Sequence, residues 1–214
     1  MKRLLPLFPL QLVAFPGSAI PLHIFEDRYK EMVGEAEASG SEFGIVLAKE
    51  GGIVNAGCTV MVEAVLQRYP DGRFDVMARG HRRFEILSLD QEKNYLRGEV
   101  EYFEDEDSAP ADPELRKRAT EALEKIQQAL PEWKETALKE NAVDPGHPLL
   151  SFELAQAVED LDFQNMLQRS RSEAERLRMF VEFAEGYIAR RLYAEKMKRA
   201  APTNGSGHMP AGAS

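Results

Sequence analysis

The sequence predicts an α+β fold in which a β-rich part precedes a helical part. Up to about residue 105, short apolar and β-branched runs stand between glycine, proline and aspartate residues, as in strands joined by tight turns. Beyond that point, apolar residues recur every three or four positions, as in amphipathic helices. An acidic, proline-containing segment separates the two patterns. We therefore expect a β-rich part at 1–104, a linker at 105–112, a helical part at 113–199 and a disordered tail at 200–214.

The β-rich part has several runs with the length and alternation of strands. Pro70-Asp71-Gly72 predicts a hairpin turn, because proline presets the turn and glycine tolerates positive φ. Strands this close in sequence favour an antiparallel meander or a small barrel. The expected strands lie at 43–48, 59–69, 74–78, 83–89 and 95–103, after two apolar runs within 4–15 that Pro9 interrupts.

One helix is expected within the β-rich part, over 24–38. Its apolar residues are spaced by three and four, and Gly40 lies just past its end, where a left-handed residue costs least. Leu22 and Phe25 are expected to be core residues. The apolar positions of this helix are Phe25, Tyr29, Met32, Val33 and Ala36.

The helical part begins with a strong start signal. Asp112 is a suitable N-cap, Pro113 suits the first helical position, and Pro131 should end the helix. A possible capping box, Ser172-x-x-Glu175, opens the longest helix, which should run to about residue 199 with an apolar stripe that reaches Leu192. Shorter helices are expected at 132–139, 149–161 and 162–169.

The bulk composition argues against several classes of partner. The net charge of −9 disfavours nucleic acid and acidic membranes as ligands, because both are bound through positive charge. No stretch approaches the length of a membrane span, and prolines interrupt the apolar N-terminal region where a signal peptide would need a continuous run. The single cysteine, Cys58, suits a reducing compartment, so a cytoplasmic location is expected.

No catalytic, metal or cofactor motif stands out, and we expect none of the three. His23-x-x-Glu26-Asp27 joins a histidine to two acids but lacks the second histidine of a zinc-binding helix. Ser18 follows Pro16-Gly17 without the glycine pattern of a nucleophile elbow, and we interpret it as a turn residue. Cys58 is interpreted as a buried small hydrophobe. Phosphate-binding glycine loops are missing from the sequence.

Two groups of basic residues leave two interpretations open. Either could bind an anion or a partner, or could form a solvated face beside acidic neighbours, and the acidity of the chain favours the second. The groups are Arg79, His81, Arg82 and Arg83, and Arg169, Arg171, Arg176 and Arg178.

The opening of the chain resembles the N-terminal domain of the Lon protease family, particularly its stand-alone bacterial form. The resemblance rests on LPLFPL at 5–10, on PLHIFEDRY at 21–29, and on the turn Pro70-Asp71-Gly72-Arg73. It continues more weakly through the helical part to about residue 195. The family implies a pseudo-barrel followed by a helical bundle, and recognition of unfolded or tagged substrates. No Walker motif and no Ser-Lys segment of the kind that Lon uses in its ATPase and peptidase domains is present in these residues.

The resemblance therefore implies a non-catalytic module that binds unfolded protein or peptide segments, as an adaptor or a chaperone. A ligand groove is expected between the β-rich part and the helices, near Pro21, His23, Glu26, Arg28 and Tyr29. Two alternatives stay open. One is an ATP-independent peptidase, and the other is a homo-oligomeric scaffold built on the long C-terminal helix; the oligomeric state is not specified by the sequence.

Overall fold

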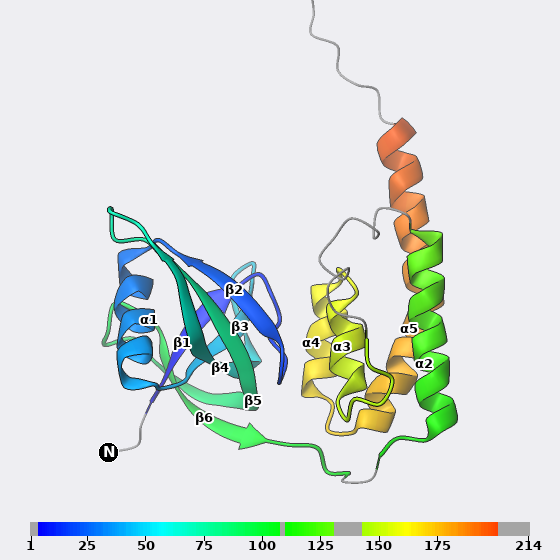
Figure 1. The fold of residues 1–214 in the computed structure, drawn as a ribbon, viewed down its shortest axis with the longest axis horizontal. Helices are drawn as coiled ribbons and strands as arrows, with labels where there is room; N and C mark the ends of the chain where they lie inside the picture. The colour runs from blue at the N-terminus through cyan, green and yellow to red at the C-terminus, as the bar shows by residue number, and fades with distance from the viewer. Residues whose placement is uncertain (1–3, 108–109, 131–142, 201–214) are drawn as a thin grey trace, which may run out of the picture.

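The structure, a computed structural model, describes residues 4–107, 110–130 and 143–200. A β-rich half and a helical half lie beside each other and are connected by the chain that follows β6 (Figure 1). The expected helix at 132–139 and the tail from 201 onward lie outside the described residues. The first half contains β1 (Leu5–Leu10), β2 (Ala19–Ile24), α1 (Asp27–Ser39), β3 (Phe43–Lys49), β4 (Gly52–Arg68), β5 (Phe74–Asp90) and β6 (Arg97–Phe103). The second contains α2 (Pro113–Ala129), α3 (Leu150–Gln156), α4 (Leu161–Arg169) and α5 (Glu173–Ala200).

The six strands form one sheet that closes on itself. Its order is β2-β5-β4-β3-β1-β6, and β6 also pairs with β5. Closure depends on the length of β5, whose first part pairs with β2 and whose second part pairs with β6. The strands expected at 74–78 and 83–89 are therefore one continuous strand. The predicted barrel is confirmed, but it is not wholly antiparallel, because β1 and β3 run parallel. The chain between them is long enough for the crossover that a parallel pair requires.

Helix α1 packs its apolar side onto the barrel, on the side remote from the helical half (Figure 1). Tyr29, Met32 and Val33 are buried, as the spacing predicts. The helix begins at Asp27 and not at residue 24, because Ile24 completes the alternation of β2 and pairs with Phe74 of β5.

The two core predictions before α1 have opposite outcomes. Leu22 is buried on the inner face of β2. Phe25 lies between strand and helix, and 58% of its surface is exposed, so its prediction as a core residue is wrong.

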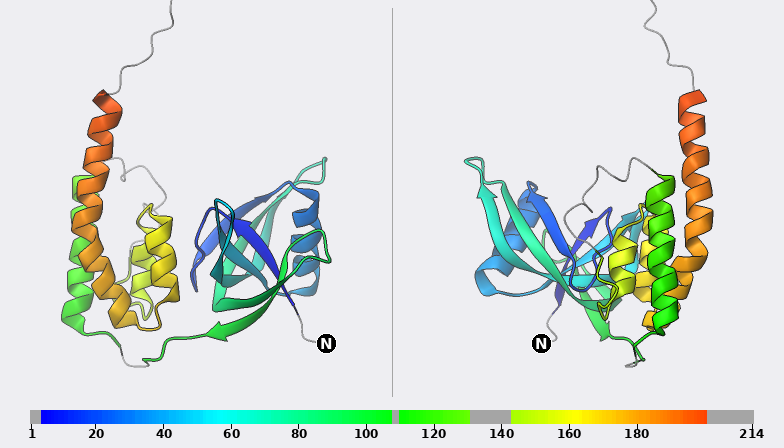
Figure 2. Two further views of the ribbon diagram at one scale, coloured as in Figure 1. Left: turned by 180° about the vertical axis from the view of Figure 1, so that it is seen from behind. Right: turned by 45° about the vertical axis from the view of Figure 1, so that its right-hand side comes forward.

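The helical half is built on α2 and α5, which lie side by side in all three ribbon views (Figures 1 and 2). The Asp112 side chain accepts a hydrogen bond from the Glu114 amide, as predicted for an N-cap. At the start of α5, the Glu175 amide donates to the Ser172 hydroxyl, which is one of the two bonds of the predicted capping box, whereas the Glu175 carboxylate accepts from the Ser170 hydroxyl. The helix expected at 149–161 ends earlier, because Asp160 caps α4 by accepting from the Phe163 amide.

The last turns of α5 extend past the end of α2 (Figure 1). Tyr187 is buried against the helical core, but Leu192 is 48% exposed. The apolar stripe predicted for this helix is therefore core only up to about Tyr187, because no neighbouring helix covers the turns that follow in the described part of the chain.

Side chains of the β-rich half are buried in the helical half. Phe15, in the loop between β1 and β2, is fully buried within the helical core and stacks on Phe152 of α3, with ring centroids 5.1 Å apart. Gln168 of α4 donates to the Ala14 carbonyl at 2.6 Å. Lys49 of β3 forms an ion pair with Asp162 of α4. These contacts tie the two halves together.

The loop that carries Phe15 crosses β5 at Gly80, which leaves no room for a side chain. A Cβ atom at Gly80 would stand 2.0 Å from the Phe15 carbonyl oxygen, and two backbone hydrogen bonds hold the loop there. Since the obstacle is backbone, we expect Gly80→Ala to lower the free energy of unfolding by about 1–3 kcal/mol in urea titrations.

The matched control is Gly34→Ala, inside α1, where an added Cβ meets nothing within 4 Å. Alanine is the better helix former by about 0.4–1 kcal/mol, so this variant should be more stable than the wild type. Equal effects of the two substitutions would contradict the close approach at Gly80.

Candidate functional site

The barrel has an unclosed seam between β1 and β2. Strand β1 pairs with β6 at Leu5 and Pro6, and the Leu7 amide still donates to the Leu96 carbonyl at 2.8 Å; residues 8–10 pair with β3. Strand β2 pairs only with β5. A groove of about 390 Å³ lies where these unpaired edges meet the start of α1. We call it the seam groove, and it is lined by Phe8, Pro9, Leu10, His23, Ile24, Phe25, Glu26, Arg28 and Tyr29.

Aromatic rings form much of the seam groove. The rings of Phe8 and Tyr29 lie 4.2 Å apart between centroids, and burial raises the pKa of Tyr29. The Arg28 guanidinium lies over the Tyr29 ring at 4.5 Å and forms an ion pair with Glu26 at 2.7 Å. The exposed ring of Phe25 stands at the edge. The groove thus offers an apolar, aromatic surface whose nearest charges already neutralise each other.

His23 contributes a polar group to the same groove. Its Nδ1 atom lies 2.5 Å from the Asp75 carboxylate on β5, and the Tyr69 hydroxyl donates to the other oxygen of that carboxylate at 2.7 Å. These two bonds, that of His23 first, lower the pKa of Asp75. The Phe25 ring stacks on the imidazole with centroids 5.9 Å apart.

Four of the five ligand-groove residues predicted from the sequence line the seam groove, namely His23, Glu26, Arg28 and Tyr29. Pro21 is exposed on β2 two residues earlier and is not among the lining residues. The lining residues of the seam groove all belong to the β-rich half, so the residues named for the ligand groove do not lie between the barrel and the helices. A separate pocket of about 380 Å³ does lie between the two halves, and the site of ligand binding stays a prediction. The β1 residues at 8–10 were missed, because only the seam brings them opposite α1.

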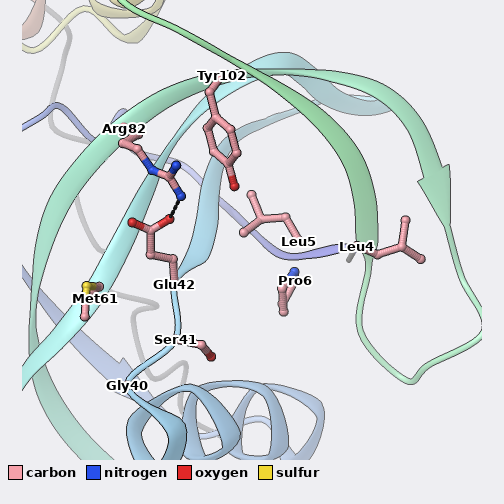
Figure 3. A pocket seen from close by; sticks show the side chains of 9 residues that line it. All are labelled: Leu4, Leu5, Pro6, Gly40, Ser41, Glu42, Met61, Arg82 and Tyr102. Atoms are coloured by element: carbon pink, nitrogen blue, oxygen red, sulfur yellow. Dashed lines mark hydrogen bonds and ion pairs between the residues drawn. The ribbon is translucent and has the colours of Figure 1, made fainter. Parts of the chain in front are cut away.

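A second pocket, of about 450 Å³, lies near the start of β1 (Figure 3). Glu42 binds Arg82 at 2.5 Å and His81 at 3.2 Å, and the Arg82 guanidinium lies 3.9 Å from the Tyr102 ring centroid. Burial acts against the charge of Glu42, but the bonds from Arg82 and His81 outweigh it and lower the pKa of this carboxyl. The pocket is lined by Leu4, Leu5, Pro6, Gly40, Ser41, Glu42, Met61, Arg82 and Tyr102.

The two groups of basic residues do not share one environment. Arg79 and Arg82 are partly exposed and pair with Glu63 and Glu42, in agreement with the solvated-face interpretation. Arg83 and Arg176 contradict it, because their side chains are only 4% and 0% exposed.

Arg83 and Arg176 share the carboxylate of Asp105, just after β6. Asp105 accepts from Arg83 at 2.5 Å and from Arg176 at 2.6 and 2.7 Å. Glu173 also accepts from Arg176, at 2.8 Å, and from the Ser151 hydroxyl. We call Arg83, Asp105, Ser151, Glu173 and Arg176 the buried charge cluster; it joins β5, the chain after β6, α3 and α5.

The charges of this cluster depend on one another. Burial would raise the pKa of Asp105, but the hydrogen bonds and attraction of Arg176 and Arg83 outweigh it, so its pKa is lowered. Burial lowers the pKa of Arg83, and the attraction of Asp105 offsets this lowering only in part. Arg83 also donates to the Ser170 carbonyl at 2.5 Å. The cluster is thus occupied by internal partners and has a structural role.

The residues considered for catalysis have structural roles as well. The Ser18 hydroxyl donates to the Phe15 carbonyl oxygen at 2.7 Å and accepts from the Phe15 amide, as a turn serine does. Cys58 is fully buried, and burial raises its pKa to about 12. Within the described ranges, no three His, Cys, Asp or Glu side chains gather as a metal site would require. None of the helices described is both long and apolar enough to cross a membrane.

Comparison with known proteins relates the chain to the N-terminal part of Lon proteases. Lon protease of Parabacteroides distasonis is 31% identical over 128 residues, which are 56% of this chain and 15% of that protein. Lon protease of Anaeromyxobacter dehalogenans is 28% identical over 162 residues, 69% of this chain and 19% of that protein. The chain therefore spans less than a fifth of the length of these relatives.

Solved structures agree with the sequence comparison. A Lon N-terminal domain protein from Xanthomonas campestris superimposes with a TM-score of 0.65 and 27% identity, covering 84% of this chain and 98% of that one. The N-terminal domain of Mycobacterium avium complex Lon protease has the same fold, with a TM-score of 0.59 and 18% identity over 86% and 98% of the two chains. The family model for the ATP-dependent protease La (LON) substrate-binding domain matches residues 4–183. Because that match spans most of the sequence, the chain belongs to the Lon substrate-binding domain family.

Proposed function

We propose that this protein binds extended or unfolded protein segments in the seam groove and does so without catalysis. The observation that carries the proposal is the exposed ring of Phe25 beside the apolar rings of Phe8 and Tyr29, at the place where the barrel is not closed. Exposed aromatic residues at a groove of this size are typical of peptide-recognition sites.

The mode of binding follows from two prolines. Proline has no N–H, and it is tolerated in a strand where its nitrogen faces the unpaired edge. Pro9 on β1 and Pro21 on β2 occupy the two edges that border the seam. A ligand strand added to either edge would lose the hydrogen bond at that proline, so these edges disfavour regular strand addition. The ligand would instead pack apolar side chains against the exposed ring of Phe25, since Phe8 and Tyr29 are only 5% and 7% exposed.

Membership of the family indicates the class of ligand that the seam groove would bind. Membership of the substrate-binding domain family supports protein segments as ligands. An adaptor or chaperone-like role in the cytoplasm belongs to the same proposal, and so does the non-catalytic assignment, since the Ser18 hydroxyl is already bound within its own turn.

The test is binding of a permanently unfolded protein, reduced and carboxymethylated α-lactalbumin carrying a fluorescent label. Fluorescence anisotropy should show binding below ~100 μM, the range of weak protein recognition. Phe25→Ser should weaken it about 10-fold, because an aromatic anchor contributes on the order of 1–2 kcal/mol.

Leu66→Ser is the matched control. Leu66 is 56% exposed on β4, almost as much as Phe25, but it does not line the seam groove. The Leu66→Ser variant should bind the unfolded protein with the affinity of the wild type. The proposal fails if the wild type does not bind, or if both serine variants bind equally well.

A further inference from the structure

The hydrogen bonds of His23 determine which ring nitrogen carries its proton. Asp75 accepts from the Tyr69 hydroxyl through one oxygen and lies 2.5 Å from His23 Nδ1 through the other. Its lowered pKa means that this carboxylate is ionised at neutral pH, and an ionised carboxylate can only accept. The proton of the short contact therefore belongs to Nδ1. The opposite nitrogen, Nε2, carries a lone pair in the neutral imidazole.

Neighbouring rings hold the imidazole in this orientation. Phe25 stacks on it, and the Tyr69 ring meets it edge-on, with centroids 5.9 Å apart and planes at 77°. The side chain is 45% exposed and lines the seam groove. Among the described residues, Nε2 has no hydrogen-bond partner. The groove thus presents a fixed acceptor that the fold itself does not use.

Other polar groups of the groove are held less firmly or are only partly engaged. Glu26 uses Oε2 toward Arg28, and its Oε1 atom and the Tyr29 hydroxyl have no hydrogen-bond partner among the described residues. The Arg28 guanidinium is bound by Glu26 and lies over the Tyr29 ring. Pro9 has no N–H to offer. A ligand that enters the groove therefore meets an acceptor at His23, and the common donor of a protein segment is its backbone N–H.

We propose that His23 Nε2 accepts a hydrogen bond from a backbone N–H of the bound segment and so determines which segments bind. This inference rests on the proposed function of the seam groove. It selects an extended segment that presents a free N–H beside an apolar side chain, and it rejects one with proline or another N-substituted residue at that position, because the acceptor is then left unpaired.

The same geometry makes recognition depend on pH. When the imidazole gains its second proton, Nε2 becomes a donor and faces the donor of the ligand. The charged and titratable groups around it are Asp75 on β5, Tyr69 and Arg73 in the β4–β5 turn, and Glu26, Arg28 and Tyr29 at the start of α1. Protonation of the imidazole is the step that turns Nε2 from an acceptor into a donor. We therefore expect the affinity to be lower at pH 5.5 than at pH 7.5.

The experiment uses the whole chain and a fluorescein-labelled peptide of twelve residues, Phe-Leu-Phe flanked by glycine and serine. A second peptide is N-methylated at the three central amides. Wild type should bind the first peptide about 3- to 10-fold more weakly at pH 5.5 than at pH 7.5, the size of one net hydrogen bond. At pH 7.5 it should bind the N-methylated peptide more weakly by a similar factor.

The test variant is His23→Phe, which keeps an aromatic ring against Phe25 and removes the acceptor. It should bind weakly at both pH values and should not distinguish the two peptides. The matched control is His81→Phe. His81 is 42% exposed and contacts the Glu42 carboxylate at 3.2 Å, but it lies outside the seam groove. This control should reproduce the wild-type pH profile.

The outcomes separate the two proposals. If no peptide and no unfolded protein binds the wild type, the proposed function fails and this inference with it. If the wild type binds and Phe25→Ser weakens binding, but His23→Phe keeps the wild-type affinity and pH profile, only the role of His23 is overturned. Equal binding of the plain and N-methylated peptides by the wild type would likewise overturn the hydrogen bond to Nε2.

Discussion

Asp105→Asn is expected to lower the free energy of unfolding by about 3–5 kcal/mol, the cost of removing one partner from a buried ion pair. The carboxylate of Asp105 is the acceptor that Arg83 and Arg176 share, and both guanidinium groups are almost fully buried. Asparagine keeps the shape of the side chain but not its charge. The two arginines would then face each other with only Glu173 to offset them. Urea denaturation followed by circular dichroism measures the loss.

The pH dependence of stability provides a second readout for the same variant. The folded-state pKa of Asp105 lies below its unfolded value of about 3.9, so its stabilisation is complete above that pH and is lost as the pH falls through the folded value. The wild type should therefore lose stability more steeply than Asp105→Asn between pH 5 and pH 2. Asp107→Asn, at an exposed acid two residues along, is the control and should change stability by less than about 0.5 kcal/mol. A similarly small effect at Asp105 would show that the buried charges do not depend on it.

Phe15→Ala should cost about 3–5 kcal/mol, as large-to-small changes of buried phenylalanine do. Phe15 belongs to the loop that follows β1, but it is fully buried in the helical core and stacks on Phe152. The cavity would open at the junction of the two halves. Besides the lower free energy of unfolding, we expect the barrel and the helices to unfold in less coincident transitions, measured by near- and far-ultraviolet circular dichroism.

The same substitution at Phe25 is the control for Phe15→Ala. Because Phe25 is 58% exposed, Phe25→Ala should change the free energy of unfolding by less than about 1 kcal/mol. If Phe15→Ala is equally mild, the two halves are not held together through this ring.

Local signals in the sequence predicted most of the elements. The Asp112 cap, the turn at Gly72 and the spacing of Tyr29, Met32 and Val33 act within a few residues, so they can be recognised without knowledge of the fold. The family resemblance predicted the barrel followed by helices and four of the residues that line the seam groove.

Features that depend on pairing between distant segments could not be predicted from local sequence patterns. The parallel pairing of β1 with β3 is set by closure of the barrel, and no local pattern encodes it. Arg83 and Arg176 look like surface charges in the sequence, because only the folded chain brings Asp105 between them. Phe25 has the spacing of a helical core residue. However, β2 continues to Ile24 and α1 begins only at Asp27, so Phe25 lies in the short connection between them and not in the helix.

The prolines that border the seam also bear on how copies of this protein behave toward one another. An unclosed barrel exposes strand edges, and exposed edges tend to pair edge to edge with other chains and so form aggregates. Pro9 and Pro21 each remove one donor from the two strand edges that border the seam. The proposed binding of unfolded chains needs an accessible sheet, and these prolines would keep that sheet from acting as a template for fibres at high protein concentration.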